Sequence, residues 1–488
     1  MFTSAHLYPC RYATLGQADF FAPVEPRGLN HPRLIHLNQP LADHFGLGGA
    51  DFTPDNFLHY LADKRLPEGV QPLACAYSGH QFGVFNPQLG DGRAMLLGEF
   101  ADPQGERWEF QLKGSGPTPY SRGFDGRAVL RSVIREYLAS EAMAGLGIPT
   151  TRALCVVDSD TPVFREEVES ASMMIRVAPS HLRFGSFEHF YARQEYDRLR
   201  QLADFCIEHY FPDLAERKDR YAAWFETVVV RTAKLIAQWQ AVGFCHGVMN
   251  TDNFSILGLT IDYGPYGFLE TYDPKHICNH SDHQGRYAFE LQPRMALWNC
   301  YCLAQALTPL VDKAALQAAL DRYDPVLQKH YLERMRAKLG LWQAGPTQEQ
   351  IDEALVAALF QLMQAQQLDY SRFFRGLCAY VDSGDTNEWL LQQGERGPIE
   401  AWLADYRLRL EEEPDADRAN KMRRENPKYV LRNYLAQQAI DAAKEGDNRL
   451  VDQLLTLLQA PFDEHPQFEP FSAAAPEWAA DLCVSCSS

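Results

Sequence analysis

The hydrophobic pattern of the chain changes once along its length, and this change constrains the fold more than any other sequence feature. From Leu73 to about Ile175, short apolar runs alternate with glycines, which is typical of strands joined by turns. One helix is predicted within this stretch, from about Arg127 to Ala144. Beyond about Phe187 the pattern becomes helical. A strand-rich unit followed by a larger helical unit predicts an α+β protein.

The helical pattern covers long segments and is interrupted once. The predicted helices are 188–211, 214–242, 291–308, 312–340, 347–366 and 429–457. The interruption, 254–268, predicts two short strands around a turn. The predicted domain division is an N-terminal extension (1–72), a strand-rich unit (73–182), a helical unit (183–460) and an irregular tail (461–488).

Charge and composition disfavour several classes of protein. The 64 acidic and 46 basic side chains give a net charge of −18, which opposes binding to nucleic acids and to anionic membranes. No stretch has the length and apolarity of a membrane span, and the first residues lack the pattern of a secretory signal. Eleven cysteines in 488 residues are too sparse for a disulfide framework. We therefore expect a cytoplasmic protein without nucleic-acid or membrane partners.

A glycine-rich turn lies between two apolar runs near the start of the strand-rich unit. Gly90 and Gly92 flank an aspartate, and Arg93 follows. Glycines let backbone amides approach a phosphate closely, and an arginine adds a forked donor. An Asp-Gly pair is equally typical of an ordinary β-hairpin turn. The motif alone leaves both interpretations open.

A lysine and a glutamate of the strand-rich unit are predicted to form a buried ion pair. Lys113 lies on the polar face of an alternating strand, and Glu136 lies on the apolar face of the predicted helix. A carboxylate on an apolar face needs a cationic partner, because an unpaired buried charge is unfavourable. Lys113 is one candidate; the alternatives are that Glu136 pairs with an arginine or extends its carboxylate towards solvent. Asp125 is predicted to cap the N-terminus of this helix.

A polar loop from His246 to Asn253 leads into an apolar segment that ends at Asp262, Tyr263 and Gly264. Asn253 and Asp262 would offer the oxygen ligands that Mg²⁺ and Mn²⁺ prefer. Taken singly, each is also an ordinary turn residue.

The order of these motifs is that of protein kinases: glycine turn, strand lysine, helix glutamate, histidine loop ending in asparagine, and Asp-x-Gly. The aspartate that serves kinases as a base is absent, because Val248 occupies its position two residues after His246. Asp252 is the nearest carboxylate that would replace it as proton acceptor.

Longer matches make the chain resemble the selenoprotein O (SelO) family of kinase-like protein adenylyltransferases. The matching segments are YSGHQFG (77–83), LGDGRA (89–94), QLKGSGPTPYSRGFDGRAVLRS (111–132), IREYLASEAM (134–143), LGIPTTRAL (146–154), HGVMNTDN (246–253), DYGPYGF (262–268), NPKYVLRNYLAQQAI (426–440) and CVSCSS (483–488). The resemblance implies a bilobal protein-kinase-like fold, with a strand-rich N-lobe, a helical C-lobe, an N-terminal extension and helical C-terminal additions.

The resemblance also implies an activity. AMP would pass from ATP to Ser, Thr or Tyr hydroxyls of proteins, this chain included, with release of pyrophosphate. ATP would lie reversed relative to a kinase, and Mg²⁺ or Mn²⁺ would assist. Three alternatives stay open: a nucleotidylyltransferase that prefers UTP, a phosphotransferase that uses Asp252 as base, and an inert, redox-sensitive pseudokinase that binds nucleotide.

Site roles follow from the matching motifs. The residues expected to contact nucleotide are Gly90, Gly92, Arg93, Lys113, Asp125, Gly126, Arg176, Arg183 and Asp262. Lys113 would hold phosphate and be oriented by Glu136, while Asp252 would accept the proton. Arg176 and Arg183 would clamp the far phosphates, and Asn253 with Asp262 would bind the metal.

The chain ends in a Cys-x-x-Cys pair, Cys483 and Cys486. Animal homologues of the family carry selenocysteine at the third position from the C-terminus, where this chain has Cys486. We hypothesise a disulfide between Cys278, which follows the Asp-x-Gly motif, and a tail cysteine, preferably Cys486. Free thiols and half of a zinc site, completed by the histidines around His280, are the alternatives.

Overall fold

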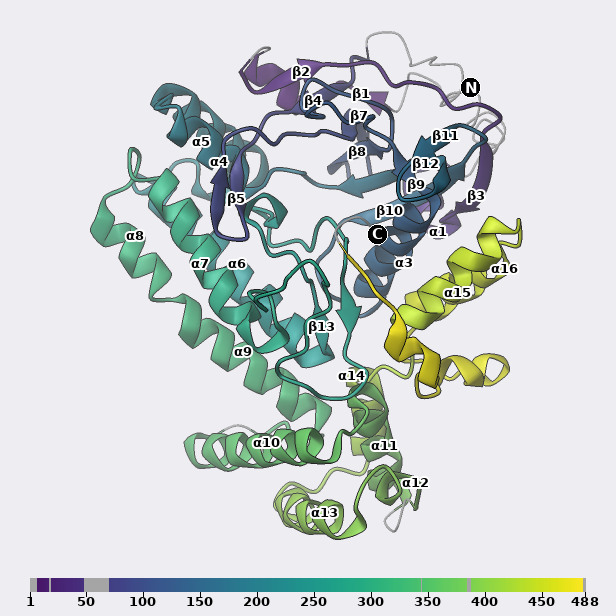
Figure 1. Ribbon diagram of the computed structural model, residues 1–488. Coiled ribbons are helices and arrows are strands. Elements are labelled where there is room, and N and C mark those ends of the chain that lie inside the picture. Colours follow the sequence, from purple (N-terminus) through teal and green to yellow (C-terminus); the bar gives the residue numbers. More distant parts are fainter. Residues whose placement is uncertain (1–6, 17–18, 48–69, 344, 384–387, 486–488) are drawn as a thin grey trace.

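A computed structural model describes residues 7–16, 19–47, 70–343, 345–383 and 388–485 (Figure 1). The strands are β1 (Leu7–Tyr8), β2 (Phe21–Pro23), β3 (Arg33–Leu37), β4 (Leu73–Cys75), β5 (Gly79–Gln81), β6 (Val84–Asn86), β7 (Ala94–Ala101), β8 (Arg107–Lys113), β9 (Ala128–Val129), β10 (Arg152–Asp158), β11 (Pro162–Phe164), β12 (Val168–Ala178), β13 (Phe244–Cys245) and β14 (Gly267–Phe268). The helices are α1 (Gln39–His44), α3 (Leu130–Gly145), α4 (Phe184–Ala192), α5 (Tyr196–Tyr210), α6 (Arg220–Val242), α7 (Gln292–Ala306), α8 (Lys313–Leu320), α9 (Tyr323–Lys338), α10 (Pro346–Gln366), α11 (Tyr370–Ser383), α12 (Glu388–Leu391), α13 (Arg396–Glu411), α14 (Arg418–Glu425), α15 (Asn433–Lys444) and α16 (Arg449–Gln459). The expected strand-rich half and helical half are both present, so the α+β class is confirmed.

An antiparallel sheet forms the strand-rich half, with ten strands in the described residues and the central order β2-β4-β7-β8-β12-β10-β3. Strand β1 pairs with β7, while β9 and β11 pair with β12. The first residues therefore complete the sheet: β1, β2 and β3 each pair with a strand of the following unit. Three segments of the predicted extension, residues 1–6, 17–18 and 48–69, lie outside the described residues.

Strand β8 is buried on both faces. The alternating pattern predicts one face open to solvent, yet Glu109, Gln111 and Lys113 on that face are all buried. The open face is wrong, because α3 and the start of the helical half cover this side of the sheet, where Glu109 meets His181. The predicted buried pair of Lys113 with Glu136 of α3 is confirmed. A polar face can therefore be buried when another charged surface lies against it.

Helix α3 lies between the sheet and the last two helices, α15 and α16 (Figure 1). Gly145 packs so closely on the Leu458 carbonyl oxygen of α16 that no Cβ would fit. The helix begins at Leu130, and its N-cap is Val129, so the prediction of Asp125 as its cap is wrong. Asp125 instead accepts from the Arg127 amide in the preceding loop at 2.9 Å.

The helical half differs from the prediction in its breaks. The segments 188–211, 312–340 and 429–457 each divide into two helices, and the pattern does not predict α11, α13 and α14. The predicted strand pair in 254–268 is also wrong: Phe254 and Thr260 form only an isolated bridge, while β14 pairs with β13.

In the part of the chain that the structure describes, no helix is long and apolar enough to cross a bilayer. Helices α10 to α14 form a group at the end of the molecule away from the sheet (Figure 1).

Candidate active site

A cavity of about 800 Å³ opens between the sheet and the loops that follow β13. The predicted site residues that line it are Gly90, Gly92, Arg93, Lys113, Asp125, Gly126, Arg176, Asp252, Asn253 and Asp262. Glu136 and Arg183 do not line the cavity, but each contacts a residue that does. Segments far apart in sequence thus contribute to one site, as the motif order predicted.

The glycine turn is shaped by close packing rather than by a hairpin. Strands β6 and β7 on its two sides do not pair with each other within the described sheets, so the hairpin interpretation is wrong. Gly90 has a φ of 78°, and a Cβ there would collide with the Tyr120 ring. The buried carboxylate of Asp91 fixes the turn, because its Oδ2 accepts from the Cys75 amide at 3.0 Å. The turn therefore presents backbone to the cavity in one held conformation.

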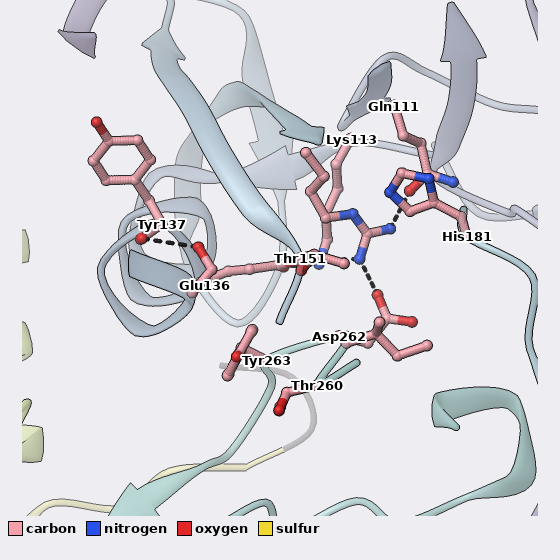
Figure 2. Close-up of polar contacts among 12 residues, drawn as sticks. Gln111, Lys113, Glu136, Tyr137, Thr151, His181, Thr260, Asp262 and Tyr263 are labelled. Carbon is pink, nitrogen blue, oxygen red and sulfur yellow. Dashed lines mark hydrogen bonds and ion pairs between the residues drawn. The ribbon is translucent and has the colours of Figure 1, made fainter. Parts of the chain in front are cut away.

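Lys113 and Arg176 both contact the Glu136 carboxylate. Lys113 Nζ forms an ion pair with Glu136 Oε2, and Arg176 Nη1 donates to Glu136 Oε1 at 3.1 Å. Arg176 also donates to Gln111, its direct cross-strand neighbour in the β8–β12 register. Burial lowers the pKa of Lys113 to about 8, although Glu136 opposes the shift. Figure 2 shows Gln111 and Lys113 on the sheet side of this network and Glu136 projecting from α3.

Asp262 closes the network from the opposite side of the cavity (Figure 2). Its φ of 57° is unusual for a residue with a side chain. Its Oδ1 accepts from Arg176, and its Oδ2 accepts from Arg183 Nη1 at 2.7 Å. Burial would raise the pKa of Asp262, but Arg176, Arg183 and Lys113 together hold that pKa well below its ordinary value. The carboxylate is therefore ionised and lies among three cations.

His246 holds the two ends of the loop that supplies the oxygen ligands. Its ring stacks on Trp239 with centroids 5.3 Å apart, and its Nε2 lies 3.0 Å from the Ile261 carbonyl oxygen. The Val248 amide donates to Nδ1 at 3.3 Å. Asn253 in turn donates its side-chain N–H to the Val248 carbonyl at 3.0 Å, which leaves its Oδ1 as an acceptor. The histidine thus orients this loop.

Asp252 has a buried carboxylate, and only one of its two oxygens accepts a hydrogen bond from the described residues. Its Oδ2 accepts from Gln81 Nε2 at 3.1 Å, while its Oδ1 is buried without a hydrogen-bond partner among the described residues. Burial raises the pKa of Asp252 to about 7, and Arg183 opposes the rise. A carboxylate with a free oxygen and a pKa near neutrality is suited to accept a proton.

Several contacts of the site were not predicted. The hairpin β5–β6 contacts the helical half through its backbone. The His80 amide donates to Thr251 Oγ1 at 2.7 Å, and the Phe82 amide donates to Asn250 Oδ1 at 3.1 Å. Arg183 lies over the Tyr77 ring at 4.6 Å from its centroid. Gln81, which holds Asp252, belongs to the YSGHQFG motif, and that match was the one sequence signal for it. Its partner is 171 residues away, so no local pattern connects the two.

The remaining predicted residues are Asp125 and the cysteines. Asp125 forms two hydrogen bonds with Arg165, at 2.8 and 2.9 Å, at the rim of the cavity. Cys278 is a buried free thiol that donates to the Cys245 carbonyl at 3.4 Å, and burial raises its pKa. Cys483 is exposed, and Cys486 lies outside the described residues.

The zinc alternative gains no support from the histidines around His280. No close group of metal-ligating side chains found within the described segments includes them.

Comparison with known proteins places the whole chain in one group. A family model described as protein adenylyltransferase SelO matches residues 3–459. Proteins named protein nucleotidyltransferase YdiU are similar along their full length: 53% identical in Thioalkalivibrio sulfidiphilus and 50% in Myxococcus xanthus, with 98% of each chain covered. The homologue of that name in Vibrio cholerae is 50% identical with the same coverage. On these matches, the chain belongs to the SelO family of protein adenylyltransferases.

Proposed function

We propose that the cavity binds ATP and that the chain transfers AMP to Ser, Thr or Tyr hydroxyls of proteins, with pyrophosphate as the leaving group. The nucleotide lies reversed relative to a kinase, so its α-phosphate faces the acceptor. The two halves of the molecule act as the lobes of a kinase-like fold, divided at residues 73, 183 and 461 as in the sequence-based scheme. Family membership supports the reaction class.

The single observation that carries this function is the free Oδ1 of Asp252, which is buried at the cavity although Val248 replaces the usual kinase base. In the transfer, the acceptor hydroxyl oxygen bonds to the α-phosphorus, and the bond from that phosphorus to the bridging oxygen breaks. Asp252 takes the hydroxyl proton, and pyrophosphate carries away the electron pair.

The cations of the site suit the triphosphate. Lys113 and Arg93 line the cavity from the sheet side, and Arg176 and Arg183 lie next to each other on Asp262. Charge accumulates on pyrophosphate as it leaves, and fixed cations stabilise that charge. We assign Arg176 and Arg183 to the far phosphates and Lys113, oriented by Glu136, to the phosphate nearest the reacting centre. Gly90, Gly92, Asp125 and Gly126 would contact the nucleotide from the sheet side.

Asn253 and Asp262 fit a divalent cation, because they offer one amide oxygen and one ionised carboxylate beside the same cavity. Mg²⁺ or Mn²⁺ held there would supply charge neutralisation for the phosphates. Both oxygens of Asp262 are taken up by Arg176 and Arg183. Binding of phosphates by the arginines would release this carboxylate for the metal, so we expect nucleotide and metal to favour each other's binding.

We also propose that Cys278 and Cys486 form a regulatory disulfide when an added two-electron oxidant, such as a peroxide or a small-molecule disulfide, takes the two electrons and two protons from their thiols. The contact that supports it is the 2.9 Å hydrogen bond from the His280 amide to the Val484 carbonyl, which brings the tail beside the segment of Cys278.

The function is tested by labelling a generic acceptor protein with ATP that carries radioactive phosphorus at either the α or the γ position. Label from the α position alone is the expected result. Label from the γ position alone would establish a phosphotransferase instead. A third incubation with α-labelled UTP decides the base, and binding of ATP without transfer of any label would favour the pseudokinase.

A further inference from the structure

Three side chains with metal-binding chemistry lie close together at the β5–β6 hairpin, outside the set of residues that line the active-site cavity (from here on, the cleft). They are His80 of β5, Glu188 of α4 and Cys302 of α7, and their ligand atoms all lie within 4.8 Å of one another. His80 Nδ1 is 2.5 Å from Glu188 Oε1. The three come from separate elements, so the group is created by the tertiary fold (Figure 1).

The carboxylate of this group is incompletely satisfied. The Glu188 side chain is only 4% exposed, and its Oε2 has no hydrogen-bond partner among the described residues. A buried carboxyl oxygen without a hydrogen-bond partner is unfavourable. Arg286 lies over the Trp298 ring at 4.7 Å, and no hydrogen bond joins it to Glu188 in the described contacts. His80 contacts Oε1 only, so a cation held among the three side chains would satisfy the remaining oxygen, Oε2.

We propose that His80, Glu188 and Cys302 bind a divalent transition-metal ion of the zinc type, with water in the fourth position. Imidazole, carboxylate and thiolate are the ligands that such an ion takes in proteins. The His80 side chain is 23% exposed, which gives water access to the site. On binding, Cys302 loses its thiol proton to solvent, and His80 carries its single proton on Nε2. The thiolate and the carboxylate then balance the two positive charges of the ion.

The ion would fasten the hairpin to α4 and α7. The same hairpin carries Gln81, whose amide holds Asp252, so metal binding would stiffen the support of that carboxylate. The metal site itself does not depend on the transfer chemistry proposed for the cleft.

Cobalt provides the test, because thiolate bound to Co²⁺ gives a charge-transfer absorption band that oxygen ligands do not. Full-length protein freed of metal by a chelator is titrated with Co²⁺. The wild type should show the band with saturation at one equivalent, and Cys302→Ser should lack it. Cys300→Ser is the matched control, because Cys300 is a fully buried cysteine of the same helix outside the group. It should keep the band.

Two further variants keep the test decisive. Glu188→Gln should weaken Co²⁺ binding by at least about tenfold, since it removes a charged ligand. Asp262→Asn should leave the band unchanged, which separates this site from the cleft. Zn²⁺ should raise the unfolding temperature of the wild type and of Cys300→Ser but not that of Cys302→Ser. Absence of the band in the wild type, or its survival in Cys302→Ser, would overturn the proposal.

Discussion

Two regions of the molecule bury networks of charged side chains, and they differ in how completely those charges are paired. One is the cleft network of Lys113, Glu136, Arg176, Arg183 and Asp262. The other, which we call the distal ion cluster, consists of Arg336, Asp352, Arg409 and Glu413 and lies among α9, α10 and α13. Asp352 is fully buried, and its two oxygens accept from Arg336 Nε and Arg409 Nε, each at 2.7 Å.

Within the described chain, every buried side-chain polar atom of the distal ion cluster has a partner. Glu413, for example, accepts from the amides of Trp342 and Gln343 at 2.8 and 2.9 Å. In the cleft, by contrast, Arg176 Nε and the neighbouring Asp252 Oδ1 are buried without partners among the described residues, and both side chains line the cavity. Buried charge alone therefore does not indicate a binding site. A cavity lined by charges that are not fully paired does.

The largest effect should come from Asp262→Ala, which removes the carboxylate common to both arginines and to the proposed metal. We expect transfer of label from α-labelled ATP to fall roughly a thousandfold or more, given what a single stabilising group contributes in a preorganised site. Circular dichroism and a cooperative unfolding transition would show that the variant folds. If Asp262→Ala transferred label at the wild-type rate, the reaction would take place outside the cleft, and the cleft network would be structural like the distal ion cluster.

The same substitution in the other network should act on folding instead. Asp352→Ala leaves Arg336 and Arg409 buried without their anion, so we expect the free energy of unfolding to fall by about 3–5 kcal/mol. Denaturant titration measures this loss, and the fraction that remains folded should transfer AMP at the normal rate. A specific loss of transfer without a loss of stability would mean that the distal ion cluster is coupled to the cleft.

The sequence predicted the parts of the cleft that motif order alone identifies. Lys113, Glu136, Asn253 and Asp262 line the cavity or contact a residue that does, because each belongs to a short motif whose local structure is fixed by glycines or by a strand. The pairing of Arg176 with Asp262 was not predicted. These residues are 86 positions apart, and their contact depends on the register of β8 with β12.

The distal ion cluster could not be predicted from local sequence patterns. Two of its residues, Arg409 and Glu413, lie in or directly after α13, which the periodicity does not predict. Likewise, the burial of Glu109 and Gln111 was not predicted, because alternation along a strand does not reveal which layer will cover its polar face. Local patterns predicted the strand-rich half and the helical half, whereas burial and long-range pairing required the tertiary structure.

The burial of the Asp252 carboxylate predicts a pH dependence of transfer that the distal ion cluster should not share. Because its pKa is raised to about 7, transfer should fall about tenfold per pH unit below that value as the base becomes protonated. Stability should change in the opposite sense. Between the ordinary pKa of 3.8 and about 7, the folded chain keeps a proton that the unfolded chain has released. The contribution of Asp252 to the free energy of unfolding therefore decreases as pH rises through this window.

Rates of transfer from α-labelled ATP between pH 5 and 9 would measure the predicted fall of activity below pH 7. Denaturant unfolding at the same pH values would measure the predicted change in the free energy of unfolding. Asp252→Asn should abolish both dependences. A flat pH profile in the wild type would contradict the role of Asp252 as proton acceptor.

The smallest effect should come from the hydrogen bond that Asp252 Oδ2 accepts from the side chain of Gln81. Gln81→Leu removes an amide that stabilises the ionised carboxylate, so the pKa of Asp252 should rise further, by about one unit. Near pH 7 this would lower transfer about fivefold, and at pH 9 the rate should approach that of the wild type. Gln88→Leu, at an exposed glutamine of the same region, should leave the profile unchanged. An equal loss at every pH would instead mean that Gln81 holds the hairpin in place without tuning the base, so this profile separates an electrostatic role from a structural one.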